Sequence, residues 1–167
     1  MSAILTYMEN THLAYLAGIV DGEGSIELVL FKKTTLNLRL HVYNSDRPLF
    51  DWIEAHFGGK TYDIHRKARV EKPQWAPVYS WNIAGQAACD LLSALLPFMV
   101  VKVAQAKLAI EAWNARQPVP RTTRGYDGRA RPSDAVIALR HAFVHQMHRL
   151  NTKNRGKGAQ EPCNHTP

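Results

Sequence analysis

Two consecutive runs of alternating apolar and polar residues constrain the fold of this chain most strongly. In residues 25–33 and again in residues 36–43, every second residue is Ile, Leu or Val. This alternation is typical of strands that turn one face toward a hydrophobic core. Thr34 and Thr35 lie between the runs as a turn. The pattern therefore predicts a β-hairpin.

The rest of the chain indicates helices around a second hairpin. A helix that is capped by Thr11 ends at Gly22 and Gly24, and Pro48 begins another that ends at Phe57. Further strands are expected at 60–67 and at 78–83, and Tyr62 and Ile64 are expected to share the core face of the first of them. Further helices are expected at 86–96, 101–116 and 133–150. The predicted class is α+β: a four-stranded antiparallel sheet backed on one face by helices. Residues 1–150 form a single domain, and 151–167 form a basic C-terminal tail.

The charge balance favours a polyanionic partner. The 167 residues contain 21 Lys and Arg against 14 Asp and Glu, which gives a net charge of +7 and a pI near 9.6. Double-stranded DNA is the partner we expect, although a soluble protein that is merely basic has the same composition.

Cysteine usage and hydropathy indicate where the protein resides. Cys89 and Cys163 are too few and too far apart for a disulfide framework, which favours a reducing compartment. No apolar run approaches the length of a membrane span, and the N-terminus lacks a secretory pattern. We expect a cytoplasmic protein without membrane contact and without a small-molecule cofactor.

The face of the sheet that points away from the helices is a candidate DNA-binding surface. A β-ribbon fits the major groove, where Arg, Lys, Asn and His read base edges and apolar groups contact thymine methyls. An ordinary solvated sheet face is the alternative. The residues expected on this face are Glu27, Val29, Phe31, Lys33, Asn37, Arg39, His41, Thr61, Asp63, His65, Lys67, Ser80 and Asn82.

The junction between the first helix and the first strand carries two acids. Asp21 and Glu23 flank Gly22 where the chain is expected to leave helical geometry, so that the two acids need not point to opposite sides. Carboxylates and an accessible carbonyl are suitable ligands for Mg²⁺, although a solvated turn has the same sequence. Gly18 costs helix stability and, with Ala14 and Ala17, gives a smooth surface suited to close helix packing.

Residues 16–24, LAGIVDGEG, resemble the nonapeptide signature of the LAGLIDADG homing endonucleases. The motif occurs once, inside a predicted αββαββα order over roughly residues 10–116. A single motif implies a homodimer in which the motif helices of two subunits pack together. The interface residues that follow from the resemblance are Leu13, Ala14, Leu16, Ala17, Gly18 and Asp21.

The same resemblance assigns roles at the junction. Glu23 matches the metal-binding acid and Gly22 the carbonyl ligand, whereas Asp21 matches an acid that we interpret as supporting the turn. The implied metal is Mg²⁺, with Mn²⁺ or Ca²⁺ able to substitute in binding.

Other catalytic and DNA-binding residues follow from looser matches. Residues 96–102 resemble the segment that carries the family's active-site lysine, here Lys102, although a lone lysine in an apolar helix often extends to solvent. Residues 42–44 place Asn44 as the water-orienting residue, and nearby Arg47 faces phosphate or simply begins a helix. Lys153 and Arg155 match a basic phosphate-contacting loop or form a mobile basic tail.

The implied function is a site-specific, intron-encoded homing endonuclease. As a homodimer it hydrolyses both strands of a long pseudo-palindromic DNA target with a divalent metal. An intron RNA-splicing maturase and a DNA-binding regulator without cleavage are the alternatives.

A histidine cluster on the last predicted helix is a separate candidate metal site. His141, His145 and His148 have a spacing that can bind zinc, but they lie opposite the apolar stripe of that helix and are expected to face solvent. Cys163 and His165 form a weaker pair.

Overall fold

The computed structural model describes residues 10–64, 70, 74–116 and 132–153. The predicted element order and α+β class are confirmed. The elements are α1 (Asn10–Glu23), β1 (Gly24–Phe31), β2 (Thr35–Asn44), α2 (Arg47–Phe57), β3 (Lys60–Asp63), β4 (Tyr79–Ala84), α4 (Gln86–Leu95), the 3₁₀ turn η2 (Leu96–Phe98), α5 (Val103–Asn114) and α6 (Asp134–Lys153). His65, Lys67, Arg155, Cys163 and His165 lie outside the described residues, as does the side chain of Lys153.

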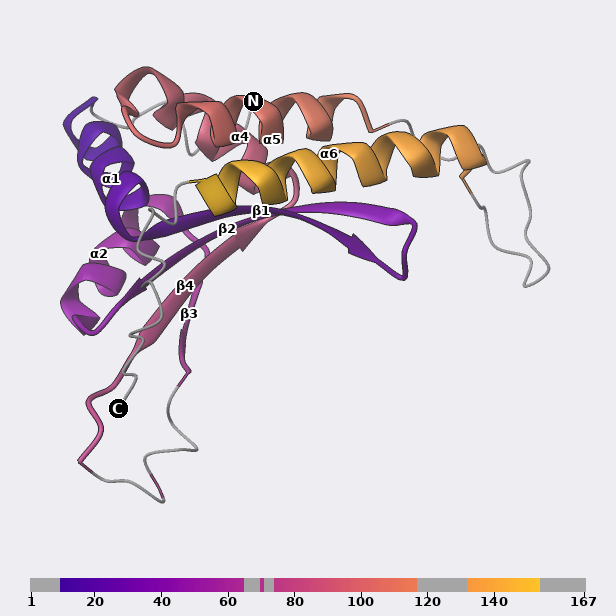
Figure 1. Cartoon of the computed structure of the whole chain (residues 1–167). Helices are drawn as coiled ribbons and strands as arrows, with labels where there is room; N and C mark the ends of the chain where they lie inside the picture. The colour runs from indigo at the N-terminus through magenta and orange to yellow at the C-terminus, as the bar shows by residue number, and fades with distance from the viewer. Residues whose placement is uncertain (1–9, 65–69, 71–73, 117–131, 154–167) are drawn as a thin grey trace, which may run out of the picture.

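The four strands form one antiparallel sheet in the order β1-β2-β4-β3. Helices α1, α4, α5 and α6 lie on one side of it (Figure 1). β1 and β2 pair from Gly24↔Val42 to Phe31↔Thr35, so the hairpin loop is 32–34. Thr34 lies in this loop as predicted, whereas the prediction for Thr35 is wrong because Thr35 begins β2. Lys32 and Lys33 occupy the loop with φ of 50° and 63°. Lys33 therefore belongs to the tip of the hairpin.

The third strand has the opposite face assignment from the one predicted. Its register pairs Tyr62 with Ser80 and Thr61 with Trp81. Asp63 and Thr61 consequently share the face of the buried Trp81, whereas Lys60 and Tyr62 share the outward face. The prediction was wrong because β3 has only four residues, and a tyrosine can be placed on either face of so short a strand.

The hydrophobic core lies between the sheet and its helices. Side chains of β1 and β2 face α1, α4 and α5, and Trp81 donates from Nε1 to the Gly58 carbonyl at 2.7 Å. Leu13, Leu16 and Ala17 are buried in this core. They therefore have no surface for a second subunit, which corrects their assignment to a dimer interface. Ala14 and Gly18 are exposed.

The first helix continues through both acids of the junction. α1 ends at Glu23 and β1 begins at once at Gly24, so Gly22 does not end the helix as predicted. Residues two apart in a helix point roughly 200° away from each other. Asp21 and Glu23 are therefore on different sides of α1, contrary to the sequence-based expectation.

The last helix packs against β1 and α5 on the helical side of the sheet. Asn151 donates from Nδ2 to the Ile26 carbonyl at 3.1 Å, and Arg140 donates to the Thr34 carbonyl at 2.5 Å. These two bonds join α6 to β1 and to the hairpin loop. None of the described helices is long and apolar enough to cross a membrane.

The abrupt change from α1 to β1 predicts unequal effects of alanine at two neighbouring glycines. A Cβ at Gly24 would lie 2.6 Å from the Val20 carbonyl oxygen, whereas a Cβ at Gly22 meets nothing within 4 Å. Gly24→Ala should lower the free energy of unfolding by about 1–3 kcal/mol. Gly22→Ala should leave the free energy of unfolding of the isolated subunit unchanged or raise it by up to about 1 kcal/mol. Urea denaturation measures both, and equal losses would contradict this packing.

Candidate active site

The Asp21 carboxylate connects the end of α1 to the segment before α5. It accepts backbone N–H groups from Val100 at 2.6 Å, Val101 at 3.1 Å and Lys102 at 2.9 Å. Partial burial raises the pKa of Asp21, but these donors and the Lys102 charge outweigh burial and hold the pKa below its usual value. With its oxygens occupied in this way, Asp21 supports the local structure and is a poor candidate for a metal ligand.

Lys102 lies where the two segments meet. It is the residue before α5, and its half-buried side chain donates from Nζ to the Val20 carbonyl at 2.9 Å and to the Asp21 carbonyl. The ammonium thus binds carbonyls at the negative end of the α1 dipole and does not extend freely to solvent. Burial lowers the pKa of Lys102 below its usual value, against the opposing effects of Asp21 and Glu23.

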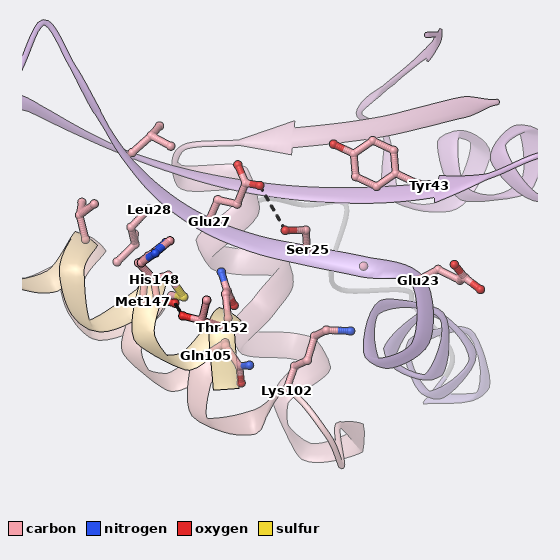
Figure 2. A pocket seen from close by; sticks show the side chains of 14 residues that line it. Glu23, Ser25, Glu27, Leu28, Tyr43, Lys102, Gln105, Met147, His148 and Thr152 are labelled. Carbon is pink, nitrogen blue, oxygen red and sulfur yellow. Dashed lines mark hydrogen bonds between the residues drawn. The ribbon is translucent and has the colours of Figure 1, made fainter. Parts of the chain in front are cut away.

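Glu23 makes no side-chain hydrogen bond or ion pair with another described residue. It is exposed at the end of α1, and its side chain points away from the other labelled residues of the cavity it lines (Figure 2). Gly22 beside it is also exposed. Mg²⁺ in nucleic-acid enzymes is commonly bound by one or two carboxylates plus phosphate oxygens and water. The hard oxygen donors of Glu23 and Gly22 fit that chemistry.

A cavity of about 760 Å³ joins Glu23 and Lys102 at the edge of β1. Its walls come from β1, β2, α5 and α6 (Figure 2). Sequence reasoning placed Glu23 and Lys102 together but missed several other lining residues, among them Ser25, Tyr43, Gln105, Asn151 and Thr152. Gln105 could have been noticed as a polar residue one turn after Lys102.

Asn44 and Arg47 do not line this cavity. The Asn44 Oδ1 accepts the Asp46 N–H at 3.1 Å, in a turn that leads into α2. Arg47 begins α2, donates from Nε to Asp51 at 2.8 Å and lies 5.7 Å from the centre of the Tyr79 ring. The hydrogen bond to Asp51 raises the pKa of Arg47. Arg47 therefore begins α2, and the start of this helix explains why neither residue reaches the cavity. The contact of Arg47 with phosphate stays a prediction.

A polar network crosses the outward face of the sheet. Ser25 donates to Glu27 at 3.2 Å, and Glu27 Oε2 lies 3.7 Å from His41 Nε2. His41 donates from Nδ1 to the Asn82 Oδ1, and Ser80 donates to the same oxygen at 3.3 Å. Side chains from three strands are thus held in fixed positions. Ser80 is only 3% exposed, so it supports Asn82 and is not itself a surface contact, which corrects its predicted role.

The remaining described residues of the predicted DNA-binding face are distributed as expected along the hairpin. Phe31 and Arg39 are exposed, Asn37 is half-buried, and Val29 lines the cavity. Lys32, which was not predicted, lies over the Phe31 ring at 5.5 Å. Lys60 and Tyr62 are exposed additions to this face from β3.

The histidine cluster of α6 is exposed. His141, His145 and His148 all face solvent, and His148 also borders the cavity. Within the described ranges, no group of three or more His, Cys, Asp or Glu is arranged to hold a metal ion.

Comparison with known proteins shows a fold but no sequence family. No family model and no curated protein matches the chain. Among solved structures, the homing endonuclease I-CvuI in complex with a DNA target has a TM-score of 0.62 at 18% identity, over 90% of this chain and 85% of that one. The archaeal intron-encoded homing endonuclease I-Vdi141I, complexed with DNA, has a TM-score of 0.62 at 14% identity, over 92% and 91%. These likenesses confirm the fold predicted from the sequence.

Replacement of Asp21 should remove a pH-dependent part of the stability. Asp21→Asn leaves one acceptor oxygen for three N–H donors, and we expect a loss of about 1–2 kcal/mol at pH 7. Because the folded-state pKa is lowered, the wild-type advantage should be complete above about pH 5, decline below the ordinary Asp value near 3.9 and be lost as the pH falls through the lower folded-state pKa. Unfolding by urea between pH 3 and 7 measures this.

Asp51→Asn, at an exposed carboxylate paired with Arg47, is the matched control and should change stability by less than about 0.5 kcal/mol. A wild-type advantage over Asp21→Asn that stays constant from pH 3 to 7 would show that the carboxylate charge does not hold the 100–102 segment.

Proposed function

We propose that this chain, which has the fold of the LAGLIDADG homing endonucleases, is a metal-dependent DNA endonuclease. It cleaves both strands of a long, approximately palindromic duplex as a homodimer. The observation that carries the proposal is that Glu23 of the nonapeptide and the remote Lys102 line one cavity beside a polar sheet face. The basic composition supports DNA as the substrate.

The roles in hydrolysis follow from the groups that are free to act. The Glu23 carboxylate and the Gly22 carbonyl would hold Mg²⁺, with Mn²⁺ or Ca²⁺ able to replace it in binding. When bound, the metal would activate water and stabilise negative charge on the phosphate. Lys102 uses two of its three N–H donors on α1 carbonyls, which leaves one for a phosphate oxygen or a water in the cavity. Asp21 keeps Lys102 in place.

DNA recognition is assigned to the outward face of the sheet. Glu27, His41 and Asn82 are held by mutual contacts, whereas Arg39 and Phe31 are exposed and free to adjust to base edges. The two lysines at the hairpin tip lie at the end of this face, where they would contact phosphates.

The homodimer is supported by the exposed side of α1. Ala14, Gly18 and Gly22 follow one another at intervals of four residues, and a Cβ at either glycine would meet nothing within 4 Å. Glycine inside a helix costs about 1 kcal/mol, and this chain's own packing does not require it. Beside the same helix end, Val100 and Val101 are 83% and 61% exposed although Asp21 holds their backbone. A second α1 packed against this stripe would explain both features.

Removal of the Glu23 charge should separate binding from cleavage. Glu23→Gln should lower the single-turnover rate on a cleavable duplex by about a thousandfold or more, since it removes the charged metal ligand. The binding affinity in Ca²⁺ should change little. Glu111→Gln, at an exposed carboxylate of α5 outside the cavity, should cut at the wild-type rate. A Glu23→Gln protein that cuts normally would remove Glu23 from the mechanism, and RNA binding without DNA cleavage by the wild type would favour a maturase.

A bulky residue at position 18 should prevent dimer formation without unfolding the subunit. Gly18→Leu points into open space in the single chain, so stability should hold or rise by up to about 1 kcal/mol. The dimer dissociation constant, measured by sedimentation velocity, should increase by about tenfold or more, which corresponds to about 1.4 kcal/mol. Ala138→Leu, on the exposed side of α6, is the control. An undisturbed dimer would place the interface elsewhere.

A further inference from the structure

Arg39 and Glu27 lie opposite each other on the outward face of the sheet. The register of β1 and β2 pairs these two residues, so their Cβ atoms are roughly 5 Å apart. Arg39 is exposed, and 39% of the Glu27 side chain is accessible. Within the part of the chain that the structure describes, no hydrogen bond or ion pair joins the Arg39 side chain to another residue. The guanidinium group and the carboxylate are therefore neighbours that do not bind each other.

The Glu27 carboxylate is held by other residues. Ser25 donates to Oε1 of Glu27 at 3.2 Å, and Figure 2 shows this bond on β1. Oε2 of Glu27 lies 3.7 Å from Nε2 of His41. An exposed Glu and Arg on neighbouring strands would ordinarily form a surface ion pair, which contributes little to stability. Here the two charges stay apart, and Ser25 uses only one of the acceptor positions of the carboxylate.

The fourth strand fixes His41 beside Glu27. Asn82 donates from Nδ2 to the Ser80 carbonyl at 3.1 Å, which turns the Oδ1 of Asn82 toward the imidazole. Nδ1 of His41 donates to this oxygen, and Nε2 is buried on the side of Glu27. The carboxylate thus has fixed neighbours before any ligand arrives, and an acceptor that is fixed in advance loses little entropy on binding.

A carboxylate beside a guanidinium group matches the major-groove edge of one G·C base pair. A carboxylate only accepts hydrogen bonds, and a guanidinium group only donates them. Guanine presents two acceptors, N7 and O6, and its partner cytosine presents the N4 donor. Adenine in place of guanine would turn its N6 donor toward the guanidinium group, and thymine would offer one acceptor instead of two.

We propose that Arg39 and Glu27 together read one G·C base pair in each half-site of the DNA target, with Arg39 on guanine and Glu27 on cytosine. A reversed base pair would bring donor against donor at Arg39 and acceptor against acceptor at Glu27. The orientation of the base pair is therefore selected along with its composition. This inference rests on the proposed function, because it requires duplex DNA on the outward face of the sheet.

The test begins with the duplexes that the full chain binds from a randomised library in Ca²⁺. The bound sequences should share a G·C base pair, in one orientation, at two positions related by a two-fold axis. Replacement of this base pair by C·G, A·T or T·A should raise the dissociation constant of the wild type by about tenfold or more.

Three variants show whether both side chains read that base pair. Arg39→Gln and Glu27→Gln should each remove most of the preference at the same two positions and leave the other positions as in the wild type. Ser25→Ala should weaken the same preference by a smaller factor, because it removes the hydroxyl that holds Glu27. Glu111→Gln, at an exposed carboxylate of α5, is the matched control and should keep every preference.

The outcomes separate this inference from the proposed function. A wild type that cuts a defined site, with Arg39→Gln and Glu27→Gln altering different base pairs or none, would overturn the inference alone. A selected target that lacks the oriented G·C base pair would also overturn it. A folded wild type that neither binds nor cuts duplex DNA would contradict the proposed function and this inference with it.

Discussion

The hydrogen bonds from three consecutive backbone N–H groups to Asp21 determine how this site is built. One carboxylate at the end of α1 holds residues 100–102, which are about 80 positions away in the chain. The Lys102 ammonium group in turn donates hydrogen bonds to the carbonyls of Val20 and Asp21. The two segments therefore fix each other, and the ammonium group is placed by the fold itself. This arrangement leaves Glu23 as the carboxylate of the junction that no described residue binds.

Different sides of α1 have different roles near the end of the helix. The inner side of α1 is buried in the core through Leu16, Ala17 and Val20. Gly18 lies on an exposed side, where an added Cβ would meet nothing within 4 Å. Asp21 accepts the N–H groups of residues 100–102, whereas Glu23, two residues further along the helix, points away from Lys102 (Figure 2). Gly24 lets β1 start directly against the backbone of Val20. Core packing, support of Lys102 and the proposed metal and partner contacts thus use different sides of one short helix.

The sequence predicted the first hairpin, the helix order and the link between Glu23 and Lys102, because long alternating runs and a specific motif determine them. It did not predict that α1 continues to Glu23, since glycines in a helix depend on surroundings that only the tertiary structure shows. The face of Tyr62 was missed because β3 is too short for alternation to decide it. Gln105 was missed because its burial in the wall of the cavity cannot be read from residue type. The sequence also did not show that Asn44 and Arg47 lie outside the cavity, at the start of α2.

The most direct test of the central claim is to expose the folded protein to a library of randomised DNA duplexes with Mg²⁺ and to sequence the ends that form. The proposed function predicts breaks in both strands, at positions related by a two-fold axis between similar half-sites. Intact duplexes in Mg²⁺ and in Mn²⁺, from protein whose circular dichroism shows the native fold and which still binds DNA, would contradict it. Such a result would leave a DNA-binding protein that has the endonuclease fold without its chemistry.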